Sequence, residues 1–355
     1  MTRRETLMAV AGTTIAMETP TSRSTRTATP INRSRLGIVT YALDIHQRQR
    51  WAGRHAGLHP AAALLEECHL LGAGGIQCPL EHKDAAAAAA LRERAERYGM
   101  FIEASLIPPR DDADVARFEK EVQLAQQAGA TVSRTVIMPG RRYEQFRSMA
   151  EFRQAETQGL KSLQLAEPIV AKHRFRLAVE NHKDHRIAER LELLRRLSSE
   201  FIGACVDVGN NLALLQDPLD VVRALAPWAM TVHLKDHLVR EYDEGFLMAD
   251  VALGEGFLEL PAMVKVLREA KPELRFDFES ITRDALKVPV LTDGYWVTLS
   301  DTPAHELART WRLIKTRSHP EPLTAVSKLP EAQQRDLERS NLERSLAYAR
   351  DRLGL

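Results

Sequence analysis

The sequence is poor in net charge and in long apolar runs. Its 355 residues include 49 Lys and Arg against 48 Asp and Glu, which gives a formal net charge of +1. Proteins that bind nucleic acid usually carry a basic face and a high isoelectric point, and this balance provides neither. No apolar run approaches the roughly 18 residues that a membrane-spanning helix needs. We therefore expect neither nucleic acid nor a membrane as a partner.

Cysteines and glycine-rich loops are also scarce. The three cysteines, Cys68, Cys78 and Cys205, are odd in number and lack Cys-x-x-Cys spacing, so they predict neither a disulfide framework nor a zinc site. We expect them to be small buried apolar residues. The segment 40–43, Thr-Tyr-Ala-Leu, follows the first expected strand and is not a glycine-rich phosphate loop. The absence of a glycine-rich phosphate loop at this position argues against a doubly wound open sheet.

The first 34 residues differ in composition from the rest of the chain. The pair Arg3-Arg4 precedes a mildly apolar stretch over residues 7–17, and a segment rich in Ser, Thr and Arg follows. This pattern is typical of a twin-arginine export signal with a linker, which would place the protein in the periplasm or outside the cell. The alternative is a disordered basic tail on a cytoplasmic enzyme.

From residue 35 onward, strand-forming and helix-forming segments alternate. Apolar runs bounded by Gly, Pro and polar residues predict strands at residues 36–41, 75–78, 100–106, 133–138, 175–180, 201–207, 230–234 and 274–279. Helical spacing of apolar residues predicts helices at 60–71, 85–98, 111–128, 154–173, 187–197, 218–225 and 258–270.

Eight such strands without a tight hairpin turn between them predict an α/β fold, a (β/α)8 TIM barrel over residues 35–315. Two further helices, at 303–316 and 330–353, predict a C-terminal helical extension, assigned to residues 316–355. The last helix is expected to pack on the barrel of its own chain. A contact with a second subunit, and so a homo-oligomer, is the alternative.

The fifth to eighth expected strands each end in a residue that can bind a metal. These residues are Glu180, Asp207, His233 and Glu279, separated by 27, 26 and 46 residues. A step of about 26 residues is roughly what one strand, one loop and one helix occupy in a barrel of about 250 residues. All barrel strands point their C-terminal ends at one mouth, so the four side chains should converge there. Three carboxylates and one imidazole suit a single divalent cation such as Mn²⁺, Mg²⁺ or Co²⁺.

Each of these residues has an ordinary structural explanation when taken alone. Glu180 begins the polar run Glu-Asn-His-Lys-Asp, which is typical of a surface loop. Asp207 could cap the next helix, although Asn210 and Asn211 are better placed for that role. A lone strand histidine such as His233 is usually a core residue. The occurrence of all four at consecutive strand ends favours a metal site.

With these motifs, residues 36 to about 315 resemble the xylose-isomerase-like TIM-barrel superfamily of sugar phosphate isomerases and epimerases. That group includes tagatose and psicose 3-epimerases, hydroxypyruvate isomerase and inosose dehydratase. The resemblance implies that the two glutamates, Glu180 and Glu279, are catalytic bases as well as metal ligands. It further implies contacts with substrate, or support of the metal ligands, for His182, Asn210, Lys235 and Asp236. Family members often have a histidine at the position of Asn210.

The chemistry that follows is proton transfer beside a carbonyl, through an enediolate of the substrate. We expect a metal-dependent isomerase or epimerase acting on a small keto- or oxo-sugar, unphosphorylated because no phosphate loop is present. A lyase that eliminates water or carbon dioxide from a 3-oxo-sugar or an inosose is the alternative. A barrel nuclease of the endonuclease IV type would need more histidines and a basic groove, and a non-catalytic sugar-binding barrel would not need all four ligands.

The segment after the seventh strand suggests a moving part. Residues 238–256 combine glycines with acidic and aromatic residues, and this composition predicts a mobile flap over the site. Tyr41, Trp228 and Phe246 are expected to act with it. An ordinary surface loop is the alternative.

Overall fold

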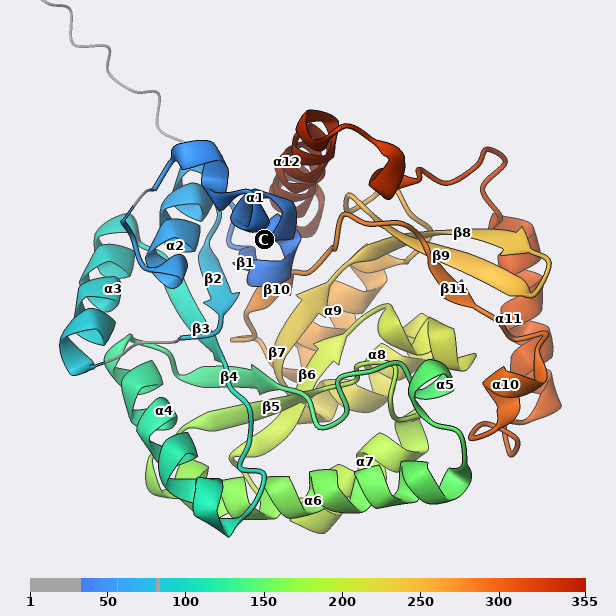
Figure 1. Ribbon diagram of the computed structural model, residues 1–355, viewed down its shortest axis with the longest axis horizontal. Coiled ribbons are helices and arrows are strands. Elements are labelled where there is room, and N and C mark those ends of the chain that lie inside the picture. The colour runs from blue at the N-terminus through green and yellow to red at the C-terminus, as the bar shows by residue number, and fades with distance from the viewer. Residues whose placement is uncertain (1–32, 56, 81–83) are drawn as a thin grey trace, which may run out of the picture. The chain divides into compact units, whose positions relative to one another are not determined.

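The structure, a computed structural model, describes residues 33–55, 57–80 and 84–355, so nearly all of the predicted export signal lies outside the described residues. Eight parallel strands form the centre of the fold. They are β1 (Gly37–Val39), β2 (Gly75–Cys78), β3 (Phe101–Ser105), β4 (Val132–Thr135), β5 (Arg176–Glu180), β6 (Ile202–Asp207), β7 (Ala229–Leu234) and β10 (Phe276–Phe278). They close into a barrel in the order β1-β10-β7-β6-β5-β4-β3-β2, which confirms the predicted TIM barrel (Figure 1).

Helices surround this barrel on the outside. The first nine are α1 (Asp44–Arg48), α2 (Pro60–Leu71), α3 (Ala85–Tyr98), α4 (Val115–Gln127), α5 (Arg142–Gln145), α6 (Met149–Lys172), α7 (Ile187–Leu197), α8 (Pro218–Leu225) and α9 (Leu260–Ala270). Within the described residues, none of the helices is both long and apolar enough to cross a membrane. The three cysteines are free and buried, as predicted.

Several boundaries differ from those predicted by a few residues, and two of these differences have a clear local cause. Helix α6 begins at Met149 rather than at 154, because the Ser148 hydroxyl caps it by accepting a hydrogen bond from the Glu151 amide (3.1 Å). Strand β4 ends at Thr135 rather than at 138. The chain leaves the barrel there, and Met138 packs with Phe152 in a small apolar cluster outside it.

A second, three-stranded sheet lies beside the barrel and includes the segment expected to be a loop, whose mobility stays a prediction. Its strands are β8 (Asp236–Tyr242), β9 (Gly245–Val251) and β11 (Leu286–Val288), in the antiparallel order β11-β9-β8. Residues 238–256 therefore contain a paired hairpin rather than an irregular loop. Phe246 is fully buried in the core of this sheet, whereas Trp228 precedes β7 at the opposite end of the strand from the mouth. Tyr41, after β1, is not part of the hairpin.

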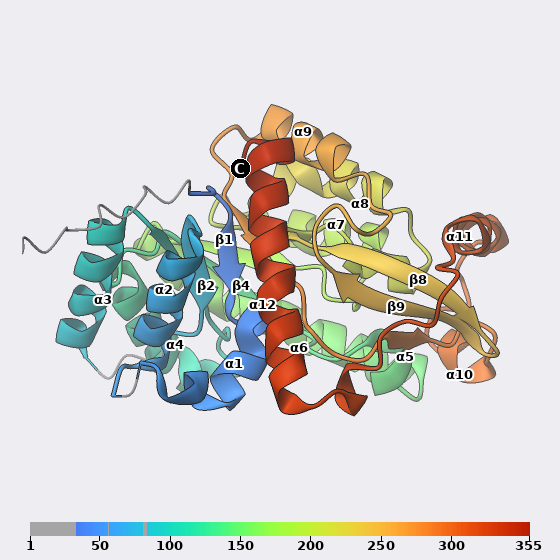
Figure 2. The same ribbon diagram turned by 90° about the horizontal axis from the view of Figure 1, so that it is seen from above.

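The two C-terminal helices have different partners. Helix α11 (Ala304–Arg317) packs against β8, and its Ile314 belongs to the core of the small sheet. Helix α12 (Glu331–Tyr348) contacts α1, and its Leu342 and Leu346 lie in the main core of the barrel (Figure 2). Residues 331–353 thus pack on the barrel of their own chain, as expected, and complete its ring of outer helices rather than standing apart as an extension.

A buried carboxylate joins this last helix to the start of the barrel. Glu338 of α12 accepts hydrogen bonds from the amides of Ile45 (2.8 Å) and His46 (3.0 Å), and its Oε2 also lies 2.6 Å from Nδ1 of His46. Glu338 is 1% exposed. Helices α12 and α1, whose contacting residues are almost 300 positions apart in the sequence, are therefore joined by a buried, charge-assisted contact.

The packing of α12 makes a testable prediction at Gly254. Gly254 has φ +85°, and a Cβ there would lie 2.3 Å from Cε2 of Tyr348. We expect Gly254→Ala to combine the strain of a positive φ, about 1–2 kcal/mol, with an overlap that costs about 1–3 kcal/mol more. The measurement is the unfolding midpoint in heat and in urea.

Two other glycines separate these effects. Gly99 has φ +63° with open space around it, so Gly99→Ala should show the backbone strain alone. Gly294 has open space and an ordinary φ, so Gly294→Ala should be neutral or slightly stabilising. Equal destabilisation by Gly254→Ala and Gly99→Ala would contradict the described contact with Tyr348.

Candidate metal and active site

The four predicted ligands converge at the C-terminal mouth of the barrel. Glu180 ends β5, Asp207 ends β6, His233 is the fifth residue of β7, and Glu279 follows β10. The register of β6 and β7 places Asp207 directly opposite His233. Each residue offers one ligand atom, all of these atoms lie within 4.8 Å of one another, and all four residues are buried. The predicted convergence is therefore confirmed.

One oxygen of Asp207 has a structural role and the other faces the cluster. Oδ1 accepts hydrogen bonds from the amides of Gly209 (2.9 Å) and Asn210 (2.8 Å), at the start of a 3-10 turn over Asn210–Leu214. Oδ2 accepts none, but lies 2.6 Å from Nζ of Lys235. Burial raises the pKa of Asp207, and the nearby Lys235 ammonium opposes this rise. Asp207 thus holds the start of the turn with Oδ1, and it presents Oδ2, paired with the Lys235 ammonium, to the cluster.

Glu180 is held by an arginine that the sequence analysis did not single out. Nε and Nη2 of Arg134, in β4, lie 2.6 and 2.5 Å from Oε2 of Glu180. Nδ2 of Asn210 donates to Oε1 (3.0 Å). Burial opposes ionisation of this carboxyl, but the Arg134 guanidinium together with His182 and His233 outweighs it and lowers the pKa of Glu180. Glu180 is therefore a carboxylate, the form that binds a metal or accepts a proton.

Glu279 is held in the same way from the other side. Nζ of Lys235 donates to its Oε2 (2.7 Å), and Nδ1 of His233 lies 3.3 Å from the same oxygen. Burial again opposes ionisation, yet Lys235 and His233 lower the pKa of Glu279 well below its usual range. The ammonium of Lys235 bridges Glu279 and Asp207, so one buried cation neutralises charge on two of the expected ligands.

The donor set fits one divalent metal ion. Metal–oxygen and metal–nitrogen bonds of about 2.0–2.6 Å put ligand atoms on opposite sides of an ion about 4–5 Å apart, and the observed limit is 4.8 Å. Nδ1 of His233 and Oδ2 of Asp207 are buried, face the cluster and make no hydrogen bond within the described part of the chain. Three carboxylates and one imidazole could therefore hold a hard or borderline cation.

The residues expected to contact substrate lie in different positions around this cluster. His182, two residues after Glu180, has a buried Nδ1 without a hydrogen-bond partner among the described residues. Asn210 is fully buried, and its Oδ1 accepts hydrogen bonds from Lys183 and from Lys235 (3.3 Å). These side chains and Lys235 all border the four-residue cluster.

Asp236, in contrast, is saturated by backbone donors. Its two oxygens accept hydrogen bonds from the amides of His237 (2.9 Å), Gly254 (3.0 Å), Gly256 (3.0 Å) and Leu258 (3.1 Å). The carboxylate therefore fixes the chain that returns from β9 to α9. This role supports the site from outside, and a direct contact of Asp236 with substrate stays a prediction.

Lys183 is a second cation that the sequence analysis missed. It is 6% exposed, and no ion pair to it is found in the described segments. Burial, reinforced by the charge of Lys235, lowers the pKa of Lys183 to about 8. Its backbone adopts φ +68°, a strained conformation for a residue other than glycine, and such strain often occurs at functional sites. The sequence does carry a feature that could have identified each of these two cations. Lys183 lies in the polar run after Glu180, and Arg134 is a charged residue inside an otherwise apolar strand.

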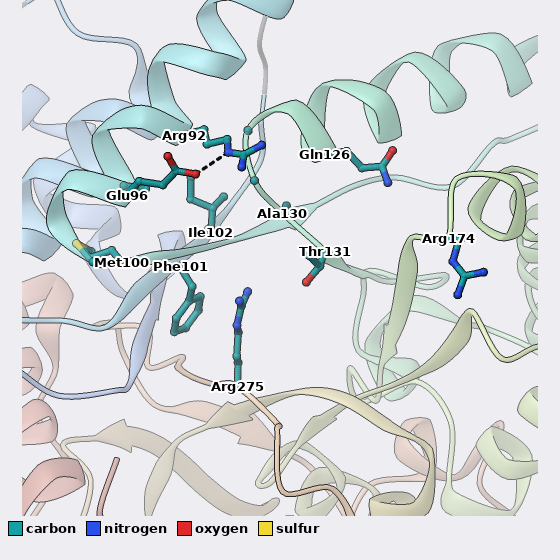
Figure 3. Close-up of a pocket in the computed structure, with 14 residues that line it drawn as sticks. Arg92, Glu96, Met100, Phe101, Ile102, Gln126, Ala130, Thr131, Arg174 and Arg275 are labelled. Atoms are coloured by element: carbon teal, nitrogen blue, oxygen red, sulfur yellow. Dashed lines mark hydrogen bonds and ion pairs between the residues drawn. The ribbon is translucent and has the colours of Figure 1, made fainter.

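A separate cleft of about 550 Å³ lies at the other end of the barrel (Figure 3). Its lining includes Phe101 at the start of β3, Thr131 just before β4, and Arg275 just before β10. None of the four cluster residues lines it. Arg275 connects this cleft with the barrel interior, because its guanidinium lies over the Phe101 ring, 4.8 Å from the ring centroid.

Fold and site together define a TIM barrel with a carboxylate–histidine cluster at its C-terminal mouth. The model of the xylose isomerase-like TIM barrel family matches residues 65–301, about two thirds of the chain, and the protein belongs to that family. A curated relative, 3-oxo-isoapionate decarboxylase of Pectobacterium atrosepticum, is 23% identical over 239 residues, which cover 66% of this chain and 80% of the relative.

Solved structures share the fold. A D-psicose 3-epimerase studied in the presence of D-fructose is 16% identical, with a TM-score of 0.55 over 90% of this chain and 99% of that one. An L-ribulose 3-epimerase is 14% identical, with a TM-score of 0.52 over 81% of this chain and 99% of that one. These three relatives are thus two epimerases and a decarboxylase, and the two solved structures show the shared fold.

The geometry predicts that Asp207→Asn and Lys235→Met change metal affinity in different ways. Loss of a ligand oxygen should weaken Mn²⁺ binding by more than the 10–100-fold typical of outer-shell changes. Lys235→Met removes a cation that occupies two ligand carboxylates, so metal affinity should be unchanged or higher. Isothermal titration of metal-stripped protein measures both. An equal loss of affinity in the two variants would contradict the described cluster.

Proposed function

We propose that this protein is a divalent-metal-dependent sugar isomerase or epimerase that acts on a small keto- or oxo-sugar through an enediolate. The observation that carries the proposal is the buried cluster of Glu180, Asp207, His233 and Glu279 within 4.8 Å. Following the strand order, Glu279 and Glu180 flank the other two residues. A substrate held over the cluster would thus meet a carboxylate on each side. Mn²⁺, Mg²⁺ and Co²⁺ are the cations that suit these ligands.

In this mechanism the two glutamates move the proton. A divalent cation held by the cluster would polarise the substrate carbonyl and make the neighbouring C–H more acidic. One carboxylate, Glu180 or Glu279, accepts that proton, and the other returns a proton to the opposite face or to the adjacent carbon. Return to the opposite face inverts the carbon, whereas return to the adjacent carbon moves the carbonyl. Lys235 and His182 are placed to orient the substrate oxygens.

The balance of buried charges favours a second candidate, decarboxylation of an oxo-sugar acid. Three cations, Arg134, Lys183 and Lys235, are buried beside the three carboxylates of the cluster. Their formal charges cancel, so a divalent ion would leave the site net positive and suited to an anionic substrate. In that reaction the bond to the carboxylate carbon breaks, its electrons form the enediolate, and a proton is then added. The decarboxylase relative supports the same chemistry.

One incubation in D₂O separates these candidates. Metal-loaded protein is given neutral ketoses and 3-oxo-sugar acids, and products are followed by NMR and by carbon dioxide release. Isomerisation or epimerisation places deuterium beside the carbonyl without loss of mass from the carbon skeleton. Decarboxylation releases carbon dioxide and leaves deuterium at the carbon that carried it. Saturable sugar binding with neither outcome would replace both candidates by a binding barrel.

Replacing Glu279 by glutamine should separate chemistry from binding. The amide keeps the size and one oxygen of the side chain but cannot accept the proton, so turnover should fall by about 10²–10⁴-fold. Substrate affinity, measured with metal present, should change far less. His182→Ala is the counterpart, because it should weaken substrate binding and leave the metal in place. Wild-type proton exchange by Glu279→Gln would overturn the two-carboxylate mechanism.

Lys183→Met should distinguish anionic from neutral substrates. If the ammonium binds a substrate carboxylate, its loss removes a charge-assisted hydrogen bond of about 1.5–3 kcal/mol, roughly a 10–100-fold rise in KM for an oxo-sugar acid. The KM of a neutral ketose should stay nearly constant. A similar rise for both substrates would indicate that Lys183 only orders the chain after β5.

A further inference from the structure

Below the metal-ligand cluster, a buried row of polar side chains continues into the barrel. Nε2 of His233 lies 2.7 Å from Oε1 of Gln77, and Nε2 of Gln77 donates to Oε2 of Glu103 (3.1 Å). The hydroxyl of Thr231 donates to the same Glu103 oxygen (2.7 Å). All four side chains are at most 1% exposed. The proposed mechanism uses none of them except His233.

We propose that Gln77, oriented by Glu103, is a positioning residue that fixes His233 in its Nε2–H form and leaves the Nδ1 lone pair facing the cluster. The inference rests on the proposed metal site and adds to it. A histidine ligand must be neutral, with an unprotonated nitrogen toward the metal, and the partner of its other nitrogen sets which one that is. Gln77 is that partner.

The orientation of the Gln77 amide follows from its second contact. Gln77 and Glu103 face each other in the register of β2 and β3. Oε2 of Glu103 accepts from both Gln77 and Thr231, so it is an acceptor. Rotating the amide by half a turn would place the Gln77 oxygen against this acceptor and its NH₂ group against His233. Only the observed orientation satisfies all three groups, and it requires a hydrogen on Nε2 of His233.

The barrel floor holds Glu103 in place. Asp277, the neighbour of Glu103 inside the barrel, has a pKa raised well above its usual range by burial and by the nearby Glu103 carboxylate. Burial also raises the pKa of Glu103, and the Thr231 hydroxyl and the charge of Arg275 oppose this rise. The backbone is shaped to this group, because a Cβ at Gly37 would lie 2.1 Å from Oδ1 of Asp277.

Without Gln77, His233 has a competing partner. Its Nδ1 lies 3.3 Å from Oε2 of Glu279 and 3.8 Å from Oε2 of Glu180. A hydrogen on Nδ1 would be attracted to these carboxylates and would block two metal ligands at once. Gln77 therefore removes an internal competitor of the metal.

The tautomer can be measured in protein that holds no metal. Metal-stripped protein labelled with ¹⁵N-histidine gives ring nitrogen shifts that distinguish Nε2–H from Nδ1–H, and His233→Asn assigns the signal. Burial opposes protonation of His233, but Glu279 and Glu180 outweigh it and raise its pKa, so the spectra are compared at alkaline pH, where the ring is neutral. Wild type should show Nε2–H. Gln77→Met, which matches the size of glutamine without its acceptor, should shift the population toward Nδ1–H.

Gln77→Glu is the matched rescue variant. In this variant one carboxyl oxygen can accept the Nε2 hydrogen, and the other, which faces Oε2 of Glu103, must share a proton with it. The variant should therefore keep the wild-type tautomer. Mn²⁺ affinity should fall about 10–100-fold in Gln77→Met and much less in Gln77→Glu. Glu103→Met removes the group that orients Gln77, so it should lower Mn²⁺ affinity by an intermediate amount. It also serves as a second test if Gln77→Met fails to fold.

The outcomes separate this inference from the proposed function. A wild-type ring with Nδ1–H, or a Gln77→Met protein with unchanged tautomer and unchanged Mn²⁺ affinity, would overturn the role of Gln77. A tautomer that responds to Gln77→Met in a protein that binds no Mn²⁺ would keep the positioning role and remove the metal function. Unfolding midpoints of the same variants report the purely structural contribution of the row.

Discussion

Three carboxylates buried within a few ångströms of one another are the constraint on which the rest of this site depends. Moving one such charge out of water costs several kcal/mol even after relaxation, and like charges at this distance repel. Glu180, Asp207 and Glu279 are tolerated because Arg134 lies against the first and Lys235 bridges the other two. The barrel can therefore fold around this cluster only because the two cations are buried with it.

The barrel itself explains why the convergence of Glu180, Asp207, His233 and Glu279 could be predicted from the sequence. A carboxylate or histidine at the end of an apolar strand breaks the pattern that burial would otherwise impose, and this break recurs at four consecutive strands. Parallel pairing with a fixed register then brings these strand-end residues together. Asp207 and His233, for example, lie directly opposite each other on neighbouring strands. Prediction succeeded where one residue at a repeated structural position carried the information.

It failed where the information lies between distant segments. The hairpin of β8 and β9 follows β7 almost without a break, and its role becomes apparent only when β11, about 35 residues later, pairs with β9 and completes a core. Helix α12 packs on its own barrel as predicted, but the contact of Glu338 with the amides of Ile45 and His46 joins distant segments and was not predicted. The role of Gln77 likewise depends on its contact with His233, which is 156 positions away in the sequence.

The position of Lys235 connects stability with function. Its ammonium contacts the oxygens of Asp207 and Glu279 that a divalent cation would also require, and the charge of these carboxylates raises the pKa of Lys235 above its ordinary value. The chain therefore carries its own counter-ion and can bury the cluster without an external cation. Metal binding would have to displace this ammonium, which lowers the net affinity for the metal. The displaced group has a long flexible stem and an existing contact with Asn210, so it would remain beside the cluster, where a substrate oxygen would be its next partner.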